Sequence, residues 1–182
     1  SASGTPALRP ILRPYDVIGS TRYVDFDTTK AVYPTAPDKC HVSHVVADTG
    51  SWEQKMAQAL EEMPEVVRYV KNQSLGFTIP YTLNGEEKQY YPDFIAQVAV
   101  DSGPSAGLQA RVNSGRSAGL QACLNLIVEV SGEARKDKAA KVTTARTLWV
   151  PAVNNHGGFG RWAFIEVTDP WDAQRSIRAA VN

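Results

Sequence analysis

The chain has 182 residues, which suits one domain with its own hydrophobic core. It carries 19 basic and 19 acidic residues, so its formal charge is zero and any surface for nucleic acid must be local. Two widely separated cysteines exclude a disulfide framework and favour a reducing compartment, so we expect a cytoplasmic protein. No apolar run approaches the roughly 18 residues of a membrane span, and the first residues lack a signal-peptide pattern.

The first part of the chain is predicted to be mostly extended. Residues 1–16 are rich in proline and small side chains, which indicates a linker or arm before a domain over 17–182. Tyr23 to Asp27 alternates apolar and polar residues and is predicted to be a short strand. Cys40 to Val46 is a second candidate strand, whose one cysteine and two histidines are too few for a structural zinc site.

The clearest helix is predicted over Asp48 to Met63, capped by Ser51 with Gln54 as its reciprocal partner. Its apolar residues recur at helical spacing and are Trp52, Met56, Ala59, Leu60 and Met63. Glu53 lies in the first turn, where it either complements the helix dipole or points at a site. Pro64 is expected to start a second helical segment, whose apolar positions are Val66, Val67 and Val70.

Residues 77–100 are predicted to form a hairpin, because Asn84-Gly85 is a strong two-residue turn signal. The outgoing strand alternates apolar residues on one face, which are Phe77, Ile79, Tyr81 and Leu83. The returning strand is expected to run from about Gln89 to Val100. Proline cannot donate to a strand ladder, so Pro92 indicates an edge, a bulge or a strand start. A bulge would re-aim Asp93, as active-site carboxylates often are.

The next segment combines a repeat with a buried strand. Residues 101–123 contain a tandem repeat of Ser-Ala-Gly-Leu-Gln-Ala and are predicted to be an insertion between two strands. Leu124 to Ser131 is predicted to be a central strand in which Glu129 and Ser131 share one face. An unpaired charge among Val, Leu and Ile is costly, so Glu129 needs a cation or a basic partner.

A helix is predicted over Asp137 to Val150, with the inner stripe Ala139, Val142, Ala145 and Trp149. The residues in and just before it form the most basic local stretch, which is either a solvated helix face or a nucleic-acid surface. These basic residues are Arg135, Lys136, Lys138, Lys141 and Arg146. The glycine-rich loop from Asn154 to Gly160 is not a phosphate loop, because no Gly-Lys-Ser/Thr follows it.

The chain is predicted to end with a strand over Arg161 to Val167 and a helix started by Asp169-Pro170. In that strand, one face is expected to carry Trp162, Phe164 and Glu166 and the other Ala163, Ile165 and Val167. That helix is expected to face inward with Trp171, Ile177 and Val181. The predicted order of helix, hairpin, strand, helix, strand and helix indicates an α/β fold with helices against a small mixed sheet.

Asp93 and Glu129 on neighbouring strands suggest a cation site, although acids on sheet faces and Pro-Asp turns are also common without such a role. The ordered series of motifs resembles the PD-(D/E)xK nuclease core, with an acid on a first helix, Pro-Asp on one strand and Glu-x-Lys on the next. More closely, residues 19–178 resemble the C-terminal endonuclease domain of the Res subunit of Type III restriction-modification enzymes. The segments that carry the resemblance are His44 to Glu53, Tyr91 to Ile95, Leu126 to Val130, Trp149 to Asn154 and the stretch on to Trp171.

The resemblance implies a restriction-endonuclease-like mixed sheet flanked by helices over 17–182. It implies that Asp93 and Glu129 bind one or two Mg²⁺ ions and that Glu53 is the acid of the first helix. The motif lysine falls at Ser131, which supplies no charge. A lysine from just downstream would have to reach back into the site, and the candidates are Lys136, Lys138 and Lys141.

The implied activity is Mg²⁺-dependent hydrolysis of double-stranded DNA, with phosphates contacted by the basic stretch. The expected DNA-binding residues are Arg135, Lys136, Lys138, Lys141 and Arg161. A helicase-like portion and a modification subunit are the implied protein partners, and no membrane partner is expected. The chain has no Gly-x-x-x-x-Gly-Lys-Ser/Thr motif, so we expect no ATP site in it. The alternative is a catalytically degenerate domain that binds DNA or docks in a complex, which Ser131 favours.

Overall fold

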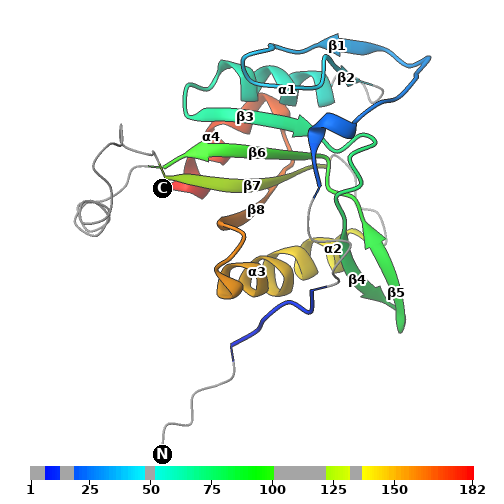
Figure 1. Ribbon diagram of the computed structural model, residues 1–182, viewed down its shortest axis with the longest axis vertical. Coiled ribbons are helices and arrows are strands. Elements are labelled where there is room, and N and C mark those ends of the chain that lie inside the picture. The colour runs from blue at the N-terminus through cyan, green and yellow to red at the C-terminus, as the bar shows by residue number, and fades with distance from the viewer. Residues whose placement is uncertain (1–6, 13–18, 48–51, 101–121, 132–136) are drawn as a thin grey trace, which may run out of the picture.

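The computed structural model describes residues 7–12, 19–47, 52–100, 122–131 and 137–182. It is a mixed α/β structure with a four-stranded sheet, helices packed against it and two small two-stranded sheets (Figure 1). Several predictions fall outside the described residues, namely the Ser51 cap, nearly all of the repeat insertion, and the basic residues Arg135 and Lys136. None of the described helices combines the length and apolar character that a bilayer-spanning segment requires.

The central sheet has the strand order β3-β6-β7-β8. Its strands are β3 (Val66–Lys71), β6 (Phe94–Ala99), β7 (Cys123–Val130) and β8 (Arg161–Val167). β3 pairs with β6 and β6 with β7 in antiparallel fashion, whereas β7 and β8 are parallel. Parallel neighbours require a long crossover, which helical segments provide here.

The crossover is longer than predicted. It consists of α2 (Lys138–Thr144), a π-helical turn (Ala145–Trp149) and α3 (Val150–His156), so the prediction that the helix ends near Val150 is wrong. Pro151 lies in the first turn of α3, where its missing N–H costs least, and the helix ends at Gly157 in the left-handed conformation. Ala145 is buried as predicted, but Ala139 is exposed and Ala140 packs inward instead.

Two predictions of secondary structure are wrong near the beginning of the sheet. Val66–Lys71 is strand β3 and not a helix, because it pairs with β6 and is rich in β-branched and aromatic residues that favour strands. Tyr23 to Asp27 is not a strand; a 3₁₀ turn over Thr21–Tyr23 precedes irregular chain. The second candidate strand is confirmed in part, since β2 (His44–Val46) pairs with β1 (Val32–Pro34).

The predicted hairpin is confirmed at its turn. β4 (Ile79–Leu83) pairs with β5 (Glu86–Tyr90) across Asn84 and Gly85, whose φ angles of 53° and 79° suit a tight two-residue turn. The returning strand, however, does not continue to Val100. Residues 91–93 interrupt it, and β6 then joins the central sheet. Pro92 therefore marks a strand start, which is one of the predicted alternatives.

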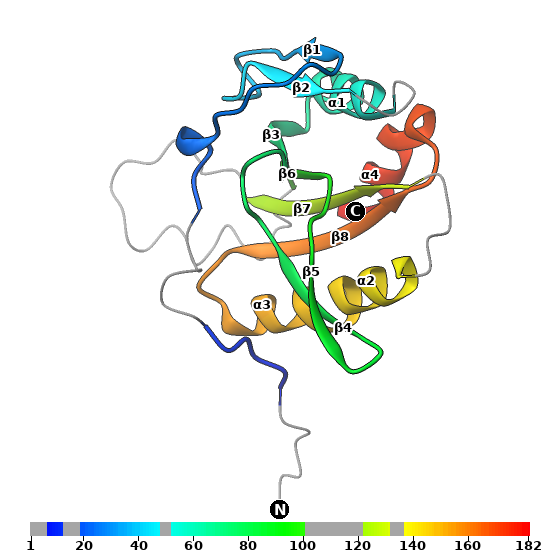
Figure 2. The same ribbon diagram turned by 90° about the vertical axis from the view of Figure 1, so that its right-hand side faces the viewer.

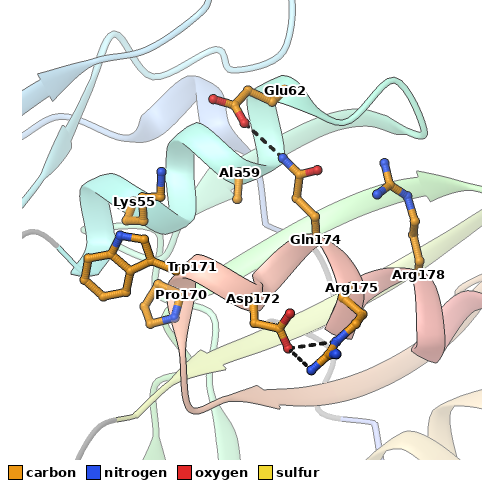
Figure 3. A pocket seen from close by; sticks show the side chains of 9 residues that line it. All are labelled: Lys55, Ala59, Glu62, Pro170, Trp171, Asp172, Gln174, Arg175 and Arg178. Atoms are coloured by element: carbon orange, nitrogen blue, oxygen red, sulfur yellow. Dashed lines mark hydrogen bonds and ion pairs between the residues drawn. The ribbon is translucent and has the colours of Figure 1, made fainter.

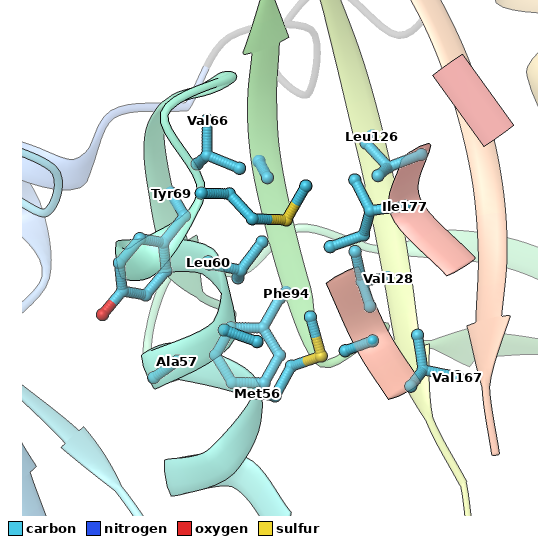
Figure 4. Close-up of a cluster of buried hydrophobic side chains, with 14 of the residues drawn as sticks. Met56, Ala57, Leu60, Val66, Tyr69, Phe94, Leu126, Val128, Val167 and Ile177 are labelled. Atoms are coloured by element: carbon cyan, nitrogen blue, oxygen red, sulfur yellow. The ribbon is translucent and has the colours of Figure 1, made fainter. Parts of the chain in front are cut away.

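Two hydrophobic cores lie on opposite faces of the central sheet. α1 (Trp52–Glu62) and α4 (Ala173–Val181) cover one face over Leu60, Phe94 and Val128 (Figure 4). α2, α3 and the β4–β5 hairpin lie on the other face (Figure 2), where the second core includes Ile127 and Phe164. The alternation predicted for β7 and β8 is confirmed, because adjacent residues of each strand enter different cores.

The last helix is confirmed with one correction. Asp169 caps the 3₁₀ turn Pro170–Asp172, from which α4 continues, and Ile177 is fully buried in the first core. Trp171 was expected to face inward, but 62% of it is exposed. The 3₁₀ turn has fewer residues per turn than an α-helix, which rotates Trp171 out of the register that the helical spacing implied.

Candidate functional site

The structure brings Asp93 and Glu129 together. Asp93 directly precedes β6, and the antiparallel register that pairs Phe94 with Val128 places Asp93 opposite Glu129 of β7. Phe94 and Val128 belong to the first core, so Glu129 projects toward the other face of the sheet, whereas Asp93 precedes the strand and its carboxyl group accepts from the backbone of Val130. Directly opposite residues of an antiparallel pair lie close enough for their side chains to interact. The two acids predicted from the sequence therefore form one site.

The two carboxyl groups are hydrogen-bonded to each other, and each accepts a hydrogen bond from a further group. The backbone N–H of Val130 donates to Oδ2 of Asp93 at 2.8 Å, and the hydroxyl of Tyr90 donates to Oε2 of Glu129 at 2.6 Å. Tyr90 ends β5 and is only 2% exposed, so its ring is fixed by packing. Sequence reasoning missed Tyr90, because no local signal shows that the end of one strand faces an acid of another sheet.

Burial raises the pKa of both acids, and the negative charge of Asp93 raises the pKa of Glu129 further. Burial is the main cause for Asp93, and the Val130 N–H and the charge of Lys71 oppose it. The pKa of Glu129 is raised to about 8, first by burial and then by the negative charge of Asp93, against the Tyr90 hydrogen bond and the charge of Lys141. Paired carboxyl groups of this kind are stabilised by a shared proton or by a cation.

Two further residues act on the pair from the side of the first core. Glu53 lies in the first turn of α1, and its negative charge raises the pKa of Asp93, although burial is the larger cause. Lys71 ends β3 beside Phe94, and its ammonium donates to the carbonyl of Val46 at 2.7 Å. Sequence reasoning missed Lys71 because its segment was predicted to be helical. The β-branched and aromatic residues of 66–71 are the signal that would have placed it.

Ser131 and Lys138 meet at one carboxylate. The Ser131 hydroxyl donates to Oε1 of Glu166 at 2.7 Å, and Nζ of Lys138 lies 2.5 Å from the same oxygen. Glu166 itself pairs with Glu129 in the parallel register of β7 and β8. A lysine ammonium is therefore present beside Ser131, the position where the resemblance expects the motif lysine.

Lys141 lies beside the β4–β5 hairpin. It forms an ion pair with Asp137 at 2.8 Å, and its ammonium is 5.8 Å from the ring centroids of both Tyr81 and Tyr90. Its charge lowers the pKa of Glu129, although burial and Asp93 outweigh it. Lys141 is thus a second cation on the hairpin side of the acid pair.

The structure does not bring every predicted residue to this site. Arg161 pairs with Leu124, whereas Glu129 pairs with Glu166, so five residues of strand, or about 16 Å, separate Arg161 from the level of the acids. Arg135 and Lys136 lie outside the described residues. Among the described residues, no three His, Cys, Asp or Glu side chains are grouped so that they could hold a metal ion.

The arrangement can bind a hard cation through oxygen atoms. Two buried carboxyl groups with raised pKa values release their protons more readily when a cation binds, and carboxylate oxygens are preferred ligands of Mg²⁺. With two such ligands, most of the octahedral positions of Mg²⁺ would go to water or substrate. Comparisons of the chain with models of protein families, with curated proteins and with solved structures found no match.

Proposed function

We propose that the chain is a Mg²⁺-dependent DNA endonuclease domain of the PD-(D/E)xK type, related to the Res subunit of Type III restriction enzymes. The observation that carries the proposal is the pairing of Asp93, at the start of β6 after Pro92, with Glu129 of β7. The order of elements supports it as well. An acid-bearing helix is followed by the three antiparallel strands of the central sheet, interrupted by the β4–β5 hairpin, and then by a helical crossover and a parallel strand.

Asp93 and Glu129 would hold the ion, and their orientation is set by Val130 and Tyr90. When bound, Mg²⁺ supplies positive charge at the scissile phosphate and lowers the pKa of water. Glu53 lies on the α1 side, and its negative charge raises the pKa of Asp93 by less than burial does. Its proximity strengthens the attraction of the site for a cation.

Lys138 takes the place of the motif lysine in this proposal. Its ammonium and the Ser131 hydroxyl share Oε1 of Glu166, so a positive charge lies beside the position that serine occupies. A lysine there stabilises negative charge that develops on the phosphate and orients the attacking water. Lys141, on the hairpin side of Glu129, is the second candidate for this role.

The DNA would be held mainly through its phosphates, by Lys138 and Lys141 together with the downstream Arg146. Arg161 lies too far along the sheet to contact the same phosphate. In the related restriction enzymes, the motor and the modification activity belong to other parts of the complex. A helicase-like portion and a modification subunit are accordingly the proposed partners.

A second function is favoured by Ser131. Serine supplies no charge, and Lys138, whose ammonium lies at the same Glu166 carboxylate, already neutralises that acid. A domain with this substitution that had lost cleavage would still bind DNA or dock within a restriction complex. The acid pair would then be a remnant of a nuclease site.

Nicking of supercoiled plasmid by the purified chain, with Mg²⁺ or Mn²⁺, separates the two functions. We expect wild type to nick and Asp93→Ala to lose at least a hundredfold in rate, since removal of one electrostatic element of an active site typically costs on that order. Glu86→Ala is the matched control, because Glu86 is an acid of the hairpin tip whose side chain is 76% exposed. Cleavage that survives Asp93→Ala would reject the site. Retained DNA binding without any cleavage by wild type would favour the second function.

A further inference from the structure

A groove lies between α1 and α4, on the side of the first core that faces solvent (Figure 3). Its volume is about 300 Å³, with Lys55 on the α1 side and Trp171 and Arg175 on the other. Gln174 donates to Oε2 of Glu62 at 2.9 Å and bridges the two helices along it. We call this feature the α1–α4 groove.

Trp171 is the most prominent side chain of the α1–α4 groove. It is 62% exposed, although its indole packs edge-on against Trp52 with ring centroids 6.4 Å apart and an interplanar angle of 87°. Its backbone N–H donates to Oδ1 of Asp169 at 3.0 Å, so the residue is held in place on a capped turn. A large apolar ring that is both exposed and rigidly supported is typical of an anchor for a binding partner.

The charges of the groove favour an anionic partner. Its lining carries three cations, Lys55, Arg175 and Arg178, against two acids. Arg175 neutralises Asp172 at 2.7 Å, whereas Gln174 is neutral and leaves the charge of Glu62 in place. Lys55, by contrast, forms no ion pair with any described residue. The groove therefore presents a lysine ammonium beside an exposed indole face, and a phosphate next to a flat ring system complements this combination.

The groove adjoins the end of the sheet that carries the acids. The chain leaves β8 after Val167, whose carbonyl accepts from the Ser131 N–H at 3.1 Å, and reaches Trp171 four residues later. On the other wall, Trp52 directly precedes Glu53 at the start of α1. The acid pair and the α1–α4 groove therefore lie toward the same end of the central sheet.

We propose that the α1–α4 groove binds a nucleic-acid strand, with an unpaired base stacked on Trp171 and a phosphate at Lys55. A single strand suits the groove better than a duplex, because the indole face needs a base that has left its stack. The proposal rests on the proposed nuclease function. It means that the domain contacts one DNA strand that is locally unpaired next to the acid pair.

Binding of a fluorescein-labelled, mixed-sequence, single-stranded oligonucleotide to the full chain tests this, by fluorescence anisotropy in EDTA so that nothing is cleaved. Trp171→Ala is expected to raise Kd roughly tenfold, the effect of one stacked base. Trp171→Phe keeps a ring and should retain most of the affinity. Lys55→Gln should lower the slope of log K against log salt by about 0.7, the value for one phosphate of a single strand. The matching duplex should lose little in any variant.

Tyr23→Ala is the control, because Tyr23 is 77% exposed beside Arg22 and lies outside the groove. Its Kd should equal that of wild type, and circular dichroism checks that each variant is folded. Unchanged affinity in Trp171→Ala, or an equal loss in Tyr23→Ala, overturns the proposal; the first result would leave the groove to a protein partner. Asp93-dependent nicking with unchanged Trp171→Ala binding rejects the groove alone. Trp171-dependent binding without any nicking rejects the nuclease function alone.

Discussion

The hydroxyl of Tyr90 donates a 2.6 Å hydrogen bond to Oε2 of Glu129, across two different sheets. Tyr90 is the last residue of the hairpin strand β5, and Glu129 lies near the end of the central strand β7. Only three residues later in the chain, Asp93 faces the same Glu129. The base of the hairpin thus orients one acid of the pair through a side chain and leads directly into the other.

Tyr90→Phe is expected to impair the site more than the fold. It removes one partly buried hydrogen bond, so the free energy of unfolding should fall by about 1–2 kcal/mol in urea denaturation. Nicking should fall more strongly, because Glu129 loses the donor that orients it. Tyr33→Phe is the matched control, since the Tyr33 hydroxyl donates to Glu61 at 2.8 Å, away from the acid pair. Nicking by Tyr90→Phe at the wild-type rate would contradict the positioning role.

Stability without metal should depend on pH through Glu129. The pKa of Glu129 is about 8 in the folded protein, above its ordinary value of 4.5, so as pH rises the unfolded chain loses this proton first. Its contribution is therefore fully present below about pH 4.5 and is lost as pH approaches 8. We expect the Tm of wild type in EDTA to fall relative to that of Glu129→Gln between pH 5 and pH 9.

Added Mg²⁺ should reverse this loss at pH 9, because it binds the folded protein with both acids ionised. Parallel Tm curves for wild type and Glu129→Gln would show that Glu129 keeps an ordinary pKa. A Tm at pH 9 that does not respond to Mg²⁺ would count against an ion at the acid pair.

A lysine at position 131 is expected to replace the positive charge that Lys138 supplies. Lys138→Gln removes the ammonium that lies 2.5 Å from Glu166, so nicking should fall by roughly a hundredfold. Adding Ser131→Lys to that variant places a lysine at the motif position and should restore much of the rate. Lys88→Gln, a substitution on the exposed hairpin, serves as the control. Wild-type nicking by Lys138→Gln would instead point to Lys141.

Packing in the first core should contribute most to the free energy of unfolding. Leu60 is fully buried between α1 and the sheet, so Leu60→Ala should lower the free energy of unfolding by about 2–5 kcal/mol. Leu148 is 52% exposed in the crossover, so Leu148→Ala should lower it by less than about 1 kcal/mol. Urea denaturation of both variants makes the comparison. Equal losses would mean that the first core is not packed as described.

Local pattern was sufficient for several elements and for the two acids. The helical spacing of Met56 and Leu60 predicted α1, the Asn84-Gly85 pair predicted the hairpin turn, and the alternation within β7 and β8 predicted their two buried faces. Asp93 stood out because it follows Pro92 at the start of an apolar run, and Glu129 because it lies among Val, Leu and Ile. Such features depend on side-chain periodicity and backbone preference, which residues close in sequence determine.

Tertiary structure alone decided which segments meet. Residues 66–71 became strand β3 because β6 offers a partner whose contacts outweigh any helical preference after Pro64. The hairpin and the central sheet separate at Pro92, which brings Tyr90 to Glu129 and Lys71 near Asp93. Lys138 reaches Ser131 through Glu166, whereas Arg161 stays at the far end of β8. These relations depend on strand pairing and burial between distant parts of the chain, which local pattern does not specify.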